Sequence, residues 1–346
     1  MKKNKLPPYT VVTRYRYQYV PYTGGGRKAK RQTLILKDEQ GKSLHPGAPL
    51  SVVWQAWERL QGKQTRPTLS WLLQTYLRSD AAAGLATNTR TEYTRQAAFI
   101  ARYRPSLKRD ECLGDVVLRA ITPGYLRQYL DTRISRQKAP ISGNREVKLI
   151  SVAWSWALGR DYVRLPNPAK LVERNKEKGR DRYVTDEEYA QAFELAAEYR
   201  YLQPAMEFAY LLRLRQAEVR ALRKSDISAR GIDCKRLKGS RDSLTFWSDR
   251  LHHAVDLALS IDAQIDSVFL LHNGDGTPLT KPGFDSSWQR LKRRMRTAGI
   301  AAFNFHDLKA KGISDTIGDK QAAGGHRTAA MVALYDRKKP EVEPTR

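Results

Sequence analysis

The sequence has few residues that could hold a metal or form a disulfide. Its 346 residues include 2 cysteines and 6 histidines. Cys112 and Cys234 lie far apart and lack CxxC or Cys/His spacing, so neither a disulfide framework nor a zinc site is predicted. The pair His306-Asp307 is joined by no further His/Asp set that would complete a metal ligand shell. We therefore expect no metal, no other cofactor, and two ordinary buried or half-exposed thiols.

Long apolar runs and nucleotide-binding loops are also missing. No stretch approaches the ~20 apolar residues of a membrane-spanning helix. Residues 1–5 lead into Pro-Pro and polar tyrosines rather than into a signal peptide. No GxxxxGK[ST] loop is present, so the sequence gives no support to chemistry driven by ATP. The simple interpretation is a protein of the bacterial cytoplasm or nucleoid with no membrane partner.

Acidic residues are scarce relative to basic ones. The chain carries 36 Asp and Glu against 62 Lys and Arg, a formal net charge of +26. Residues 1–66 hold 14 basic and 3 acidic residues, so 14 − 3 = +11 falls in this segment. Because 41 % of the residues are hydrophobic, the chain can still build ordinary globular cores. The charge predicts a polyanionic partner, and nucleic acid is favoured over an anionic membrane.

Segment 1–66 predicts a small basic β-rich module that contacts DNA. Within it TRYRYQYV alternates, so an extended strand would place Arg14, Arg16 and Gln18 opposite the intervening tyrosines. The stretch GGGRKAKR predicts a turn into a second strand in QTLILKD. A flexible charged loop and a DNA-contacting hairpin both remain open for this turn. The candidate DNA-binding residues are Arg14, Arg16, Arg27, Lys28, Lys30 and Arg31.

Residues 67–175 predict a domain of four or five helices. Thr68 is a predicted N-cap, Thr89–Glu92 is a predicted capping box, and Thr122-Pro123 predicts another helix start. A further helix is predicted within residues 141–158. Three tryptophans fall on apolar helical faces and are expected in the core, namely Trp71, Trp154 and Trp156.

The charged run 170–189 predicts a linker that ends at a capping box, Thr185 to Glu188, with a domain boundary near residue 180. Residues 180–346 then predict a mostly helical unit with a small sheet. The expected helices are 186–199, 203–224, 284–298, 307–318 and 326–337, and the expected strands lie near 231–237, 243–247 and 268–272. The predicted fold class is mainly α with small β-sheets (α+β).

Tyr335, near the end of the chain, is a candidate nucleophile. A tyrosine hydroxyl has a pKa of about 10, so it is a weak nucleophile at neutral pH without help from its surroundings. Attack on a phosphodiester builds negative charge, which guanidinium, ammonium and imidazole groups stabilise. Candidate groups of these kinds are Arg215, Lys238, His306, Lys309 and His326. The alternative is a solvated helix face, with His326 exposed and Tyr335 in an apolar stripe.

Taken together these motifs resemble the tyrosine recombinase family, the phage-integrase type of site-specific DNA recombinase. Arg215 in LRQAEVRALRKSDI is followed by a Glu three residues later, Lys238 in RLKGSRDSLTFW is similar to the family's hairpin lysine, and His306 lies in FHDLKAKG. His326 in GGHRT and Tyr335 in LYDRK complete the order. Lys309 stands where the family has an arginine, and an ammonium cannot make the planar two-pronged contact of a guanidinium. The resemblance covers residues 180–338 and, more loosely, a helical core-binding domain at 67–175.

The resemblance implies a recombinase in which Tyr335 forms a 3′-phosphotyrosyl link and releases a 5′-hydroxyl. Lys238 would be the general acid, and His306 would serve proton transfer or orientation. The implied partners are double-stranded DNA with core and arm sites, a homotetramer on that DNA, and an accessory bending protein or excisionase. It implies integration or excision of phage or mobile-element DNA. The groups implied to stabilise the transition state are Arg215, Lys309 and His326.

Two alternatives stay open at this stage. A tyrosyl phosphate intermediate also suits a DNA-relaxing enzyme of the topoisomerase IB kind. A catalytically weak DNA-binding or regulatory protein on the same scaffold is the other alternative, and Lys309 is the residue that favours it.

Overall fold

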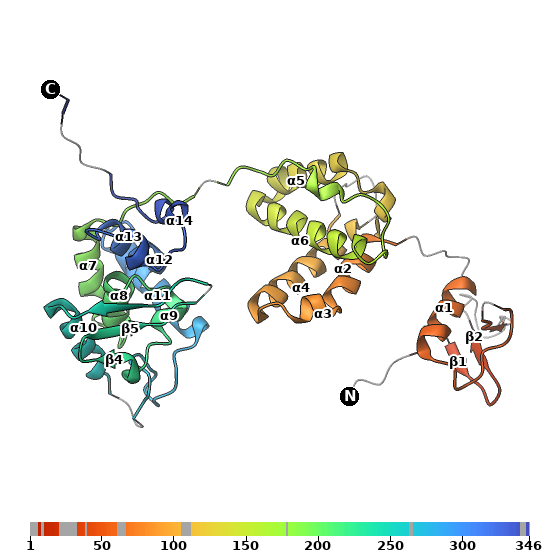
Figure 1. The fold of residues 1–346 in the computed structure, drawn as a ribbon, viewed down its shortest axis with the longest axis horizontal. Coiled ribbons are helices and arrows are strands. Elements are labelled where there is room, and N and C mark those ends of the chain that lie inside the picture. Colours follow the sequence, from red (N-terminus) through yellow and green to blue (C-terminus); the bar gives the residue numbers. More distant parts are fainter. Residues whose placement is uncertain are drawn as a thin grey trace. The chain divides into compact units, whose positions relative to one another are not determined.

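The computed structural model of the protein describes residues 6–7, 10–20, 33–38, 40–60, 67–104, 112–177, 179–237, 239–262, 266–339 and 344–345 (Figure 1). The chain forms two compact units, Met1–Glu177 and Lys178–Arg346. Helices dominate, and the described strands form two small antiparallel sheets, so the predicted fold class is confirmed. No helix in the described ranges is long and apolar enough to cross a membrane. The finer division at residue 66 stays a prediction.

The N-terminal elements form a three-stranded sheet with one helix. Tyr17 is buried in a small core, and its hydroxyl donates to the carbonyl oxygen of Pro46 at 2.7 Å. The predicted long alternating strand is wrong, because Thr13 and Arg16 close a turn through three hydrogen bonds, one between backbone groups and two that involve the Thr13 hydroxyl. Tyr15 is therefore exposed in that turn rather than aligned with Tyr17. The elements are β1 (Thr10–Val12), β2 (Tyr17–Tyr19), β3 (Leu34–Ile35) and α1 (Leu50–Leu60), in sheet order β1-β2-β3.

The second part of unit 1 is a helical bundle whose starts follow local capping signals. The Thr68 hydroxyl accepts from the Trp71 backbone N–H, and Thr122 caps the helix that begins at Pro123, as predicted. The helices are α2 (Leu69–Leu77), α3 (Asp80–Ala83), α4 (Thr87–Arg102), α5 (Pro123–Gln137) and α6 (Pro140–Leu158), with short 3₁₀ turns at Leu113–Asp115, Leu118–Ala120 and Pro168–Lys170.

Two predictions for this bundle are wrong. The capping box at Thr89 does not form, because α4 starts earlier, after Ala86, and the Glu92 carboxylate instead accepts from Arg95 and Gln96. Among the tryptophans, Trp154 is 1 % exposed and Trp156 packs at the edge of the core, but Trp71 is 40 % exposed. Helical periodicity places a residue on a face but does not determine how much of that face a neighbour covers.

Unit 2 packs helices around a second small sheet. Its first helix starts at the predicted capping box, where Thr185 and Glu188 exchange hydrogen bonds of 3.2 Å. The sheet has the order β4-β5-β6, and β5 and β6 form the predicted hairpin. The elements are α7 (Asp186–Ala196), α8 (Leu202–Leu211), α9 (Gln216–Val219), a 3₁₀ turn (Lys224–Asp226), β4 (Ile227–Ser228), β5 (Gly231–Cys234), β6 (Ser243–Phe246), α10 (Asp249–Leu259), α11 (Lys281–Thr297), α12 (Phe305–Ser314), α13 (Lys320–Gly324) and α14 (Ala329–Ala333).

The helix predicted over 203–224 is broken. Arg213 has a positive φ of 52°, so α8 ends and α9 begins after Arg215. The carbonyl oxygens of Leu212 and Arg213, which a continuous helix would have used, accept from the guanidinium of Arg236 instead. Residues near in space but distant in sequence therefore decide where this helix stops.

The helix predicted over 326–337 and the strand predicted at 268–272 are also wrong. Gly325 has a φ of 66° and ends α13, and its Cα lies so close to Arg236 that an added Cβ would approach the arginine Cδ to 2.5 Å. The chain restarts as α14, so His326 and Tyr335 do not share a helix. Residues 268–272 form single bridges, Arg223 with Phe269 and His272 with Pro278, and no strand.

The core of unit 2 centres on α8, which packs against α12. Phe208 is fully buried, and burying a side chain of this size contributes roughly 1.5–3 kcal/mol. Gly312 allows the close approach of the two helices, because a Cβ there would lie 2.1 Å from the carbonyl oxygen of Tyr210. Figure 1 shows α12, α13 and α14 gathered on one side of this core. The packing brings the start of α12 and the chain after α14 together.

Candidate active site

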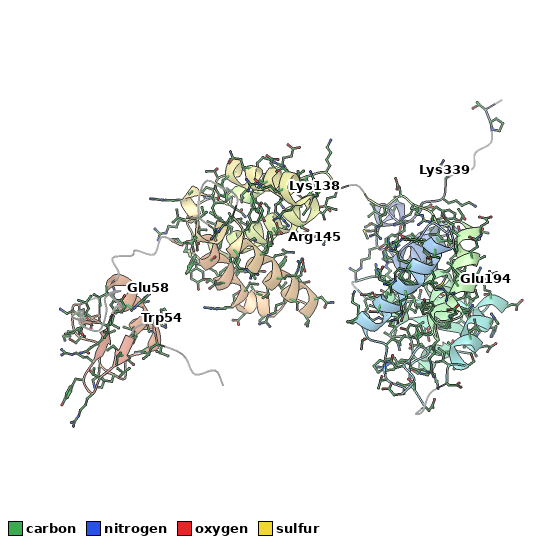
Figure 2. The ribbon with its side chains drawn as sticks, turned by 180° about the vertical axis from the view of Figure 1, so that it is seen from behind. Trp54, Glu58, Lys138, Arg145, Glu194 and Lys339 are labelled. Carbon is green, nitrogen blue, oxygen red and sulfur yellow. The ribbon has the colours of Figure 1, made fainter. Side chains whose placement is uncertain are left out.

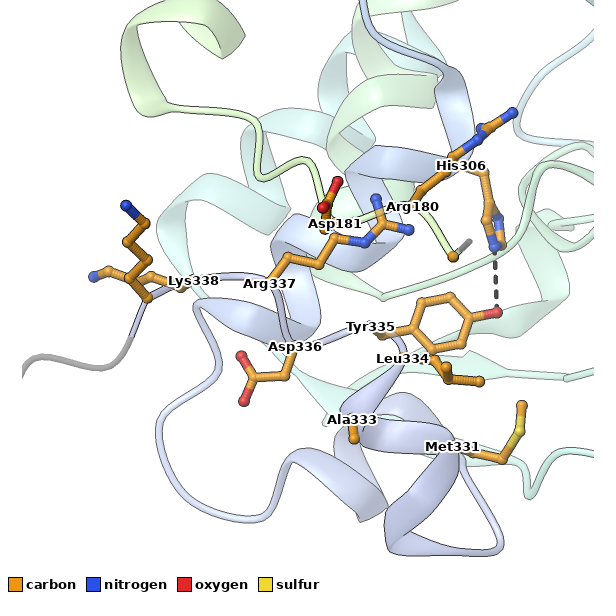
Figure 3. A pocket seen from close by; sticks show the side chains of 12 residues that line it. Arg180, Asp181, His306, Met331, Ala333, Leu334, Tyr335, Asp336, Arg337 and Lys338 are labelled. Carbon is orange, nitrogen blue, oxygen red and sulfur yellow. Dashed lines mark hydrogen bonds between the residues drawn. The ribbon is translucent and has the colours of Figure 1, made fainter. Parts of the chain in front are cut away.

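Tyr335 lies just after α14, with its side chain directed at two histidines. The hydroxyl is 3.2 Å from Nε2 of His306, the contact marked in Figure 3. The Tyr335 ring also lies 4.8 Å from the ring of His326, measured between centroids. A phenol held beside two imidazoles is not a stripe residue on a solvated helix face. The predicted juxtaposition of these three residues is present.

His306 occupies the second position of α12. The helix starts with a capping box, in which the Asp307 carboxylate accepts from the Asn304 backbone N–H at 2.8 Å, and this fixes the backbone of His306. Burial lowers the pKa of His306 to about 4, and the positive charges of Lys309 and Arg215 act in the same direction. The imidazole is therefore neutral at pH 7, so Nε2 can accept the hydroxyl proton of Tyr335.

His326 is also buried beside Tyr335. Its position depends on Gly324, because an added Cβ there would come within 2.5 Å of the imidazole Cδ2. Nε2 of His326 has no hydrogen-bond partner among the described residues. Burial lowers the pKa of His326 to about 4, with Lys309 and Arg215 again contributing. The site thus holds a buried, neutral imidazole whose free nitrogen requires a polar group.

Arg215 precedes α9 and is fixed by Glu218. Its Nη1 donates to the Glu218 carboxylate at 2.9 Å and to the hydroxyl of Ser240 at 3.1 Å. The same carboxylate accepts from the backbone N–H groups of Arg215 and Leu237, so it ties the start of α9 to the β5–β6 hairpin loop. These bonds hold the Arg215 guanidinium in place through Nη1, and Nη2 donates to none of the described residues.

Lys309 is fully buried, with 0 % of its surface exposed. Its ammonium donates to the carbonyl oxygen of Arg213 at 2.5 Å and to that of Gly324 at 3.4 Å, and it lies 5.7 Å from the centroid of the Tyr335 ring. Burial, together with the positive charges of Arg236 and Arg215, lowers the pKa of Lys309 to about 7. The departure from the family's arginine therefore lies at the centre of the site.

Arg236 is a buried cation that the sequence did not identify. Its two amino groups donate to the carbonyl oxygens of Leu212, Arg213 and Ala323 and to the hydroxyl of Ser243. It follows β5 in a run of ordinary charged residues, and no local pattern distinguishes it from an exposed arginine. Only the meeting of the end of α8 with the end of α13 reveals its role.

An open cavity of about 770 Å³ lies in front of Tyr335 (Figure 3). The tyrosine and His306 line one part of it, and Arg180, Lys338 and Lys339 add exposed positive side chains. The remaining lining includes Asp181, Asp336, Met331 and Leu334. Residues 179–181, which lie within the predicted linker at the predicted domain boundary, belong to this wall. The cavity thus presents a nucleophile and several cations to solvent on one surface of unit 2.

The structure brings together His306, Lys309, His326 and Tyr335, and it places Arg215 near enough to affect the pKa of both histidines. Lys238 lies outside the described residues, between Leu237 and Gly239 of the hairpin loop. In unit 1, Arg14 is exposed in a turn and Arg16 is half-buried beside it. The other four N-terminal candidates, Arg27, Lys28, Lys30 and Arg31, also lie outside the described residues.

Comparison by sequence gave no relative: no family model matches the chain, and no curated protein matches it. Comparison with solved structures found proteins of similar fold. The fold is similar to that of a lambda integrase dimer bound to a COC′ core site, with a TM-score of 0.66, 20 % identity, and coverage of 100 % of both chains. It is also similar to a lambda integrase tetramer bound to a Holliday junction, with a TM-score of 0.65, 19 % identity and coverage of 99 % of each chain.

A second integrase gives a similar result over most of the chain. The integrase of transposon Tn1549, in complex with circular intermediate DNA, has a TM-score of 0.63 at 15 % identity. The match covers 79 % of this chain and 96 % of that one. At these identities the similarity concerns the fold. The resemblance read from the sequence is thereby confirmed, and the chain has the fold of the tyrosine recombinases.

Proposed function

We propose that this protein is a site-specific DNA recombinase that cleaves and rejoins strands through Tyr335. The observation that carries the proposal is the hydroxyl of Tyr335 held 3.2 Å from a neutral His306, beside buried cations and an open basic cavity. A phosphodiester in that cavity would meet a nucleophile, a proton acceptor and several positive charges. The net charge of +26 supports DNA as the source of the phosphodiester.

In the proposed reaction the oxygen of Tyr335 attacks the phosphorus and displaces the 5′ oxygen, which leaves a 3′-phosphotyrosyl link. His306 accepts or orients the phenol proton, and Lys238 supplies a proton to the leaving oxygen. Arg215, Lys309 and His326 stabilise the charge that develops on the non-bridging oxygens. The 5′-hydroxyl of a partner strand then attacks the link and releases the tyrosine, so neither nucleotide hydrolysis nor a metal enters the proposal.

The proposed partners are two DNA duplexes and four copies of the chain. We assign core-type contacts to the helical part at 67–175 and arm-type contacts to residues 1–66. An accessory bending protein or an excisionase, and the integration or excision of a phage or mobile element, belong to the same proposal. Lys138 and Arg145, two exposed cations of the helical part labelled in Figure 2, are suited to phosphate contacts.

The test is to incubate the protein in chelator with sheared DNA from its source organism and to look for a covalent adduct after detergent denaturation. We expect DNA attached to the peptide that contains Tyr335, and no adduct with Tyr335→Phe. The control variant must still bind DNA, with affinity that falls steeply as salt concentration rises. Salt-sensitive binding without any adduct would reject the enzyme and support a binding protein.

One observation favours that second candidate, a DNA-binding or regulatory protein on the same scaffold. The Lys309 ammonium is bonded to two backbone carbonyls and is completely buried, so it is committed to the protein rather than to a phosphate. Lys309→Arg separates the two functions. If the substitution creates adduct formation in an otherwise silent protein, the native site is inactive because of this residue. Strand exchange between two duplexes, rather than relaxation of one, separates the recombinase from a topoisomerase-like enzyme.

A further inference from the structure

The segment that carries Tyr335 is attached to unit 2 mainly through polar contacts. No residue of α14 is buried. The carbonyl oxygen of Tyr335 accepts from the hydroxyl of Ser314 at 3.2 Å, and the same hydroxyl oxygen accepts from the backbone N–H of Arg337 at 2.8 Å. Lys320 and Asp336 add an ion pair at 2.8 Å. The position of the nucleophile therefore depends on a few directional bonds rather than on an apolar core.

Arg337 supplies the most buried of these contacts. Its Nη1 donates to the carboxylate of Asp307 at 2.8 Å and to the carbonyl oxygen of Arg182 at 3.1 Å. The two side chains of this ion pair are 8 % and 4 % exposed. Asp307 follows His306 directly, and its other carboxylate oxygen caps the start of α12 through Asn304. The bond therefore joins the chain two residues after Tyr335 to the chain one residue after His306.

We propose that Arg337 is a positioning residue, which holds Tyr335 opposite His306 through Asp307 and the Arg182 carbonyl and does not bind DNA. This inference rests on the proposed function, because it assigns a role in the same site. Burial separates Arg337 from the exposed Lys338 and Lys339 on the same cavity wall. Withdrawing this guanidinium toward a phosphate would leave the buried Asp307 carboxylate without its partner, which opposes such a movement.

The hydrogen bond from Arg337 to the Arg182 carbonyl oxygen connects the Tyr335 segment to the beginning of unit 2. Residues 179–181 line the cavity, and Arg182 itself donates to the carbonyl oxygens of Ala301 and Ala302, just before α12. Arg337 thus joins three segments: the chain that leads into unit 2, the start of α12, and the chain after Tyr335. A displacement of the first segment would reach the nucleophile through one guanidinium.

The experiment is a double-mutant cycle in the full-length protein with Arg337→Met, Asp307→Asn and the two combined. Asparagine keeps an oxygen for the Asn304 N–H but removes the charge that pairs with Arg337. Lys339→Gln, which removes an exposed cation of the same cavity, is the matched control, and Arg337→Lys is the conservative variant. Two quantities are measured: amide hydrogen exchange over residues 329–337, and the single-turnover rate of adduct formation on a duplex recovered with the wild-type adduct, with the Kd for that duplex measured separately.

We expect faster amide exchange over residues 329–337 in Arg337→Met and Asp307→Asn, and unchanged exchange over these residues in Lys339→Gln. Adduct formation should slow about 100-fold in Arg337→Met, because a displacement of about 1 Å of a reacting group can cost that much. The double variant should be no slower than Arg337→Met, Arg337→Lys should recover part of the rate, and the Kd should change less than about twofold. This pattern of coupled, rate-specific effects marks a positioning residue.

The opposite pattern would overturn the inference. If Arg337→Met weakens DNA binding, lowers its salt dependence by about one ion, and adds independently to Asp307→Asn, then Arg337 contacts DNA. Unchanged exchange over residues 329–337 would also overturn it. If the wild-type protein forms no adduct, the proposed function fails, but the exchange measurement still decides whether Arg337 holds the Tyr335 segment.

Discussion

Both units bury charged side chains, but they satisfy them differently. In the helical part of unit 1, Arg133 and Glu146 form a two-pronged ion pair with bonds of 2.9 and 2.8 Å, and their side chains are 7 % and 5 % exposed. The hydroxyl of Tyr129 donates to the same carboxylate. The charges in this group are balanced, because one buried guanidinium pairs with one buried carboxylate.

Two buried cations near Tyr335 in unit 2 have no such carboxylate among the described residues. Arg236 and Lys309 donate to backbone carbonyls, and neither forms an ion pair within the part of the chain that the structure describes. Arg215 has Glu218, but His306 and His326 add two imidazoles that resist protonation. Positive charge held without a matching acid costs folding energy, and an anion relieves that cost. The difference between the two regions indicates where a phosphate belongs.

The largest effect on stability is expected when the buried ion pair of unit 1 is broken. Glu146→Ala leaves Arg133 buried without its partner, so the free energy of unfolding should fall by about 3–5 kcal/mol in urea titrations that follow unit 1. Glu92→Gln removes the carboxylate from a more exposed pair with Arg95 and should cost about 1 kcal/mol or less. Equal losses in the two variants would show that Arg133 does not depend on its ion pair with Glu146.

The second prediction concerns acid sensitivity in unit 2. The folded pKa values of His306 and His326 are about 4, below the unfolded value near 6.5, so the unfolded chain binds more protons between these limits. The free energy of unfolding should therefore decrease as pH falls from about 6.5 toward 4, by on the order of 1–2 kcal/mol per histidine at pH 5.

Urea unfolding of unit 2 at a series of pH values tests this dependence. His326→Gln removes one titrating group and should flatten the pH curve, while unit 1 in the same samples serves as the internal reference. A variant with the same acid sensitivity as the wild type would show that His326 is protonated normally in the folded protein.

The smallest effect is expected from a simple anion. If the positive charge under Tyr335 needs an anion, sulfate at about ten times its Kd should stabilise unit 2 by roughly 1.4 kcal/mol, and unit 1 by less. Amide exchange in peptides of the two units, with and without sulfate at constant ionic strength, measures both at once. Lys309→Met should reduce the gain. Equal stabilisation of the two units would show that the buried charge of unit 2 does not bind an anion more strongly than unit 1 does.

Much of the architecture could be predicted because its signals are local. Thr68, Thr122 and Thr185 cap helices within three residues of themselves, and each of these starts is confirmed. The break that the sequence missed inside the helix predicted over 203–224, at Arg213, depends on Arg236, which lies 23 residues from Arg213 along the chain. A helical pattern continues through Arg213, so periodicity alone predicted one helix where the structure has two.

By itself the sequence determined the basic character of the chain, its fold class, and the ordered set of candidates that ends at Tyr335. These follow from composition and from short motifs, which survive any packing of the chain. Only the tertiary structure decided that Lys309 faces backbone carbonyls, that His306 and His326 both lie beside the tyrosine, and that Arg337 pairs with Asp307. Burial and pairing depend on residues about 10 to 100 positions away in the chain, and no local pattern carries that information.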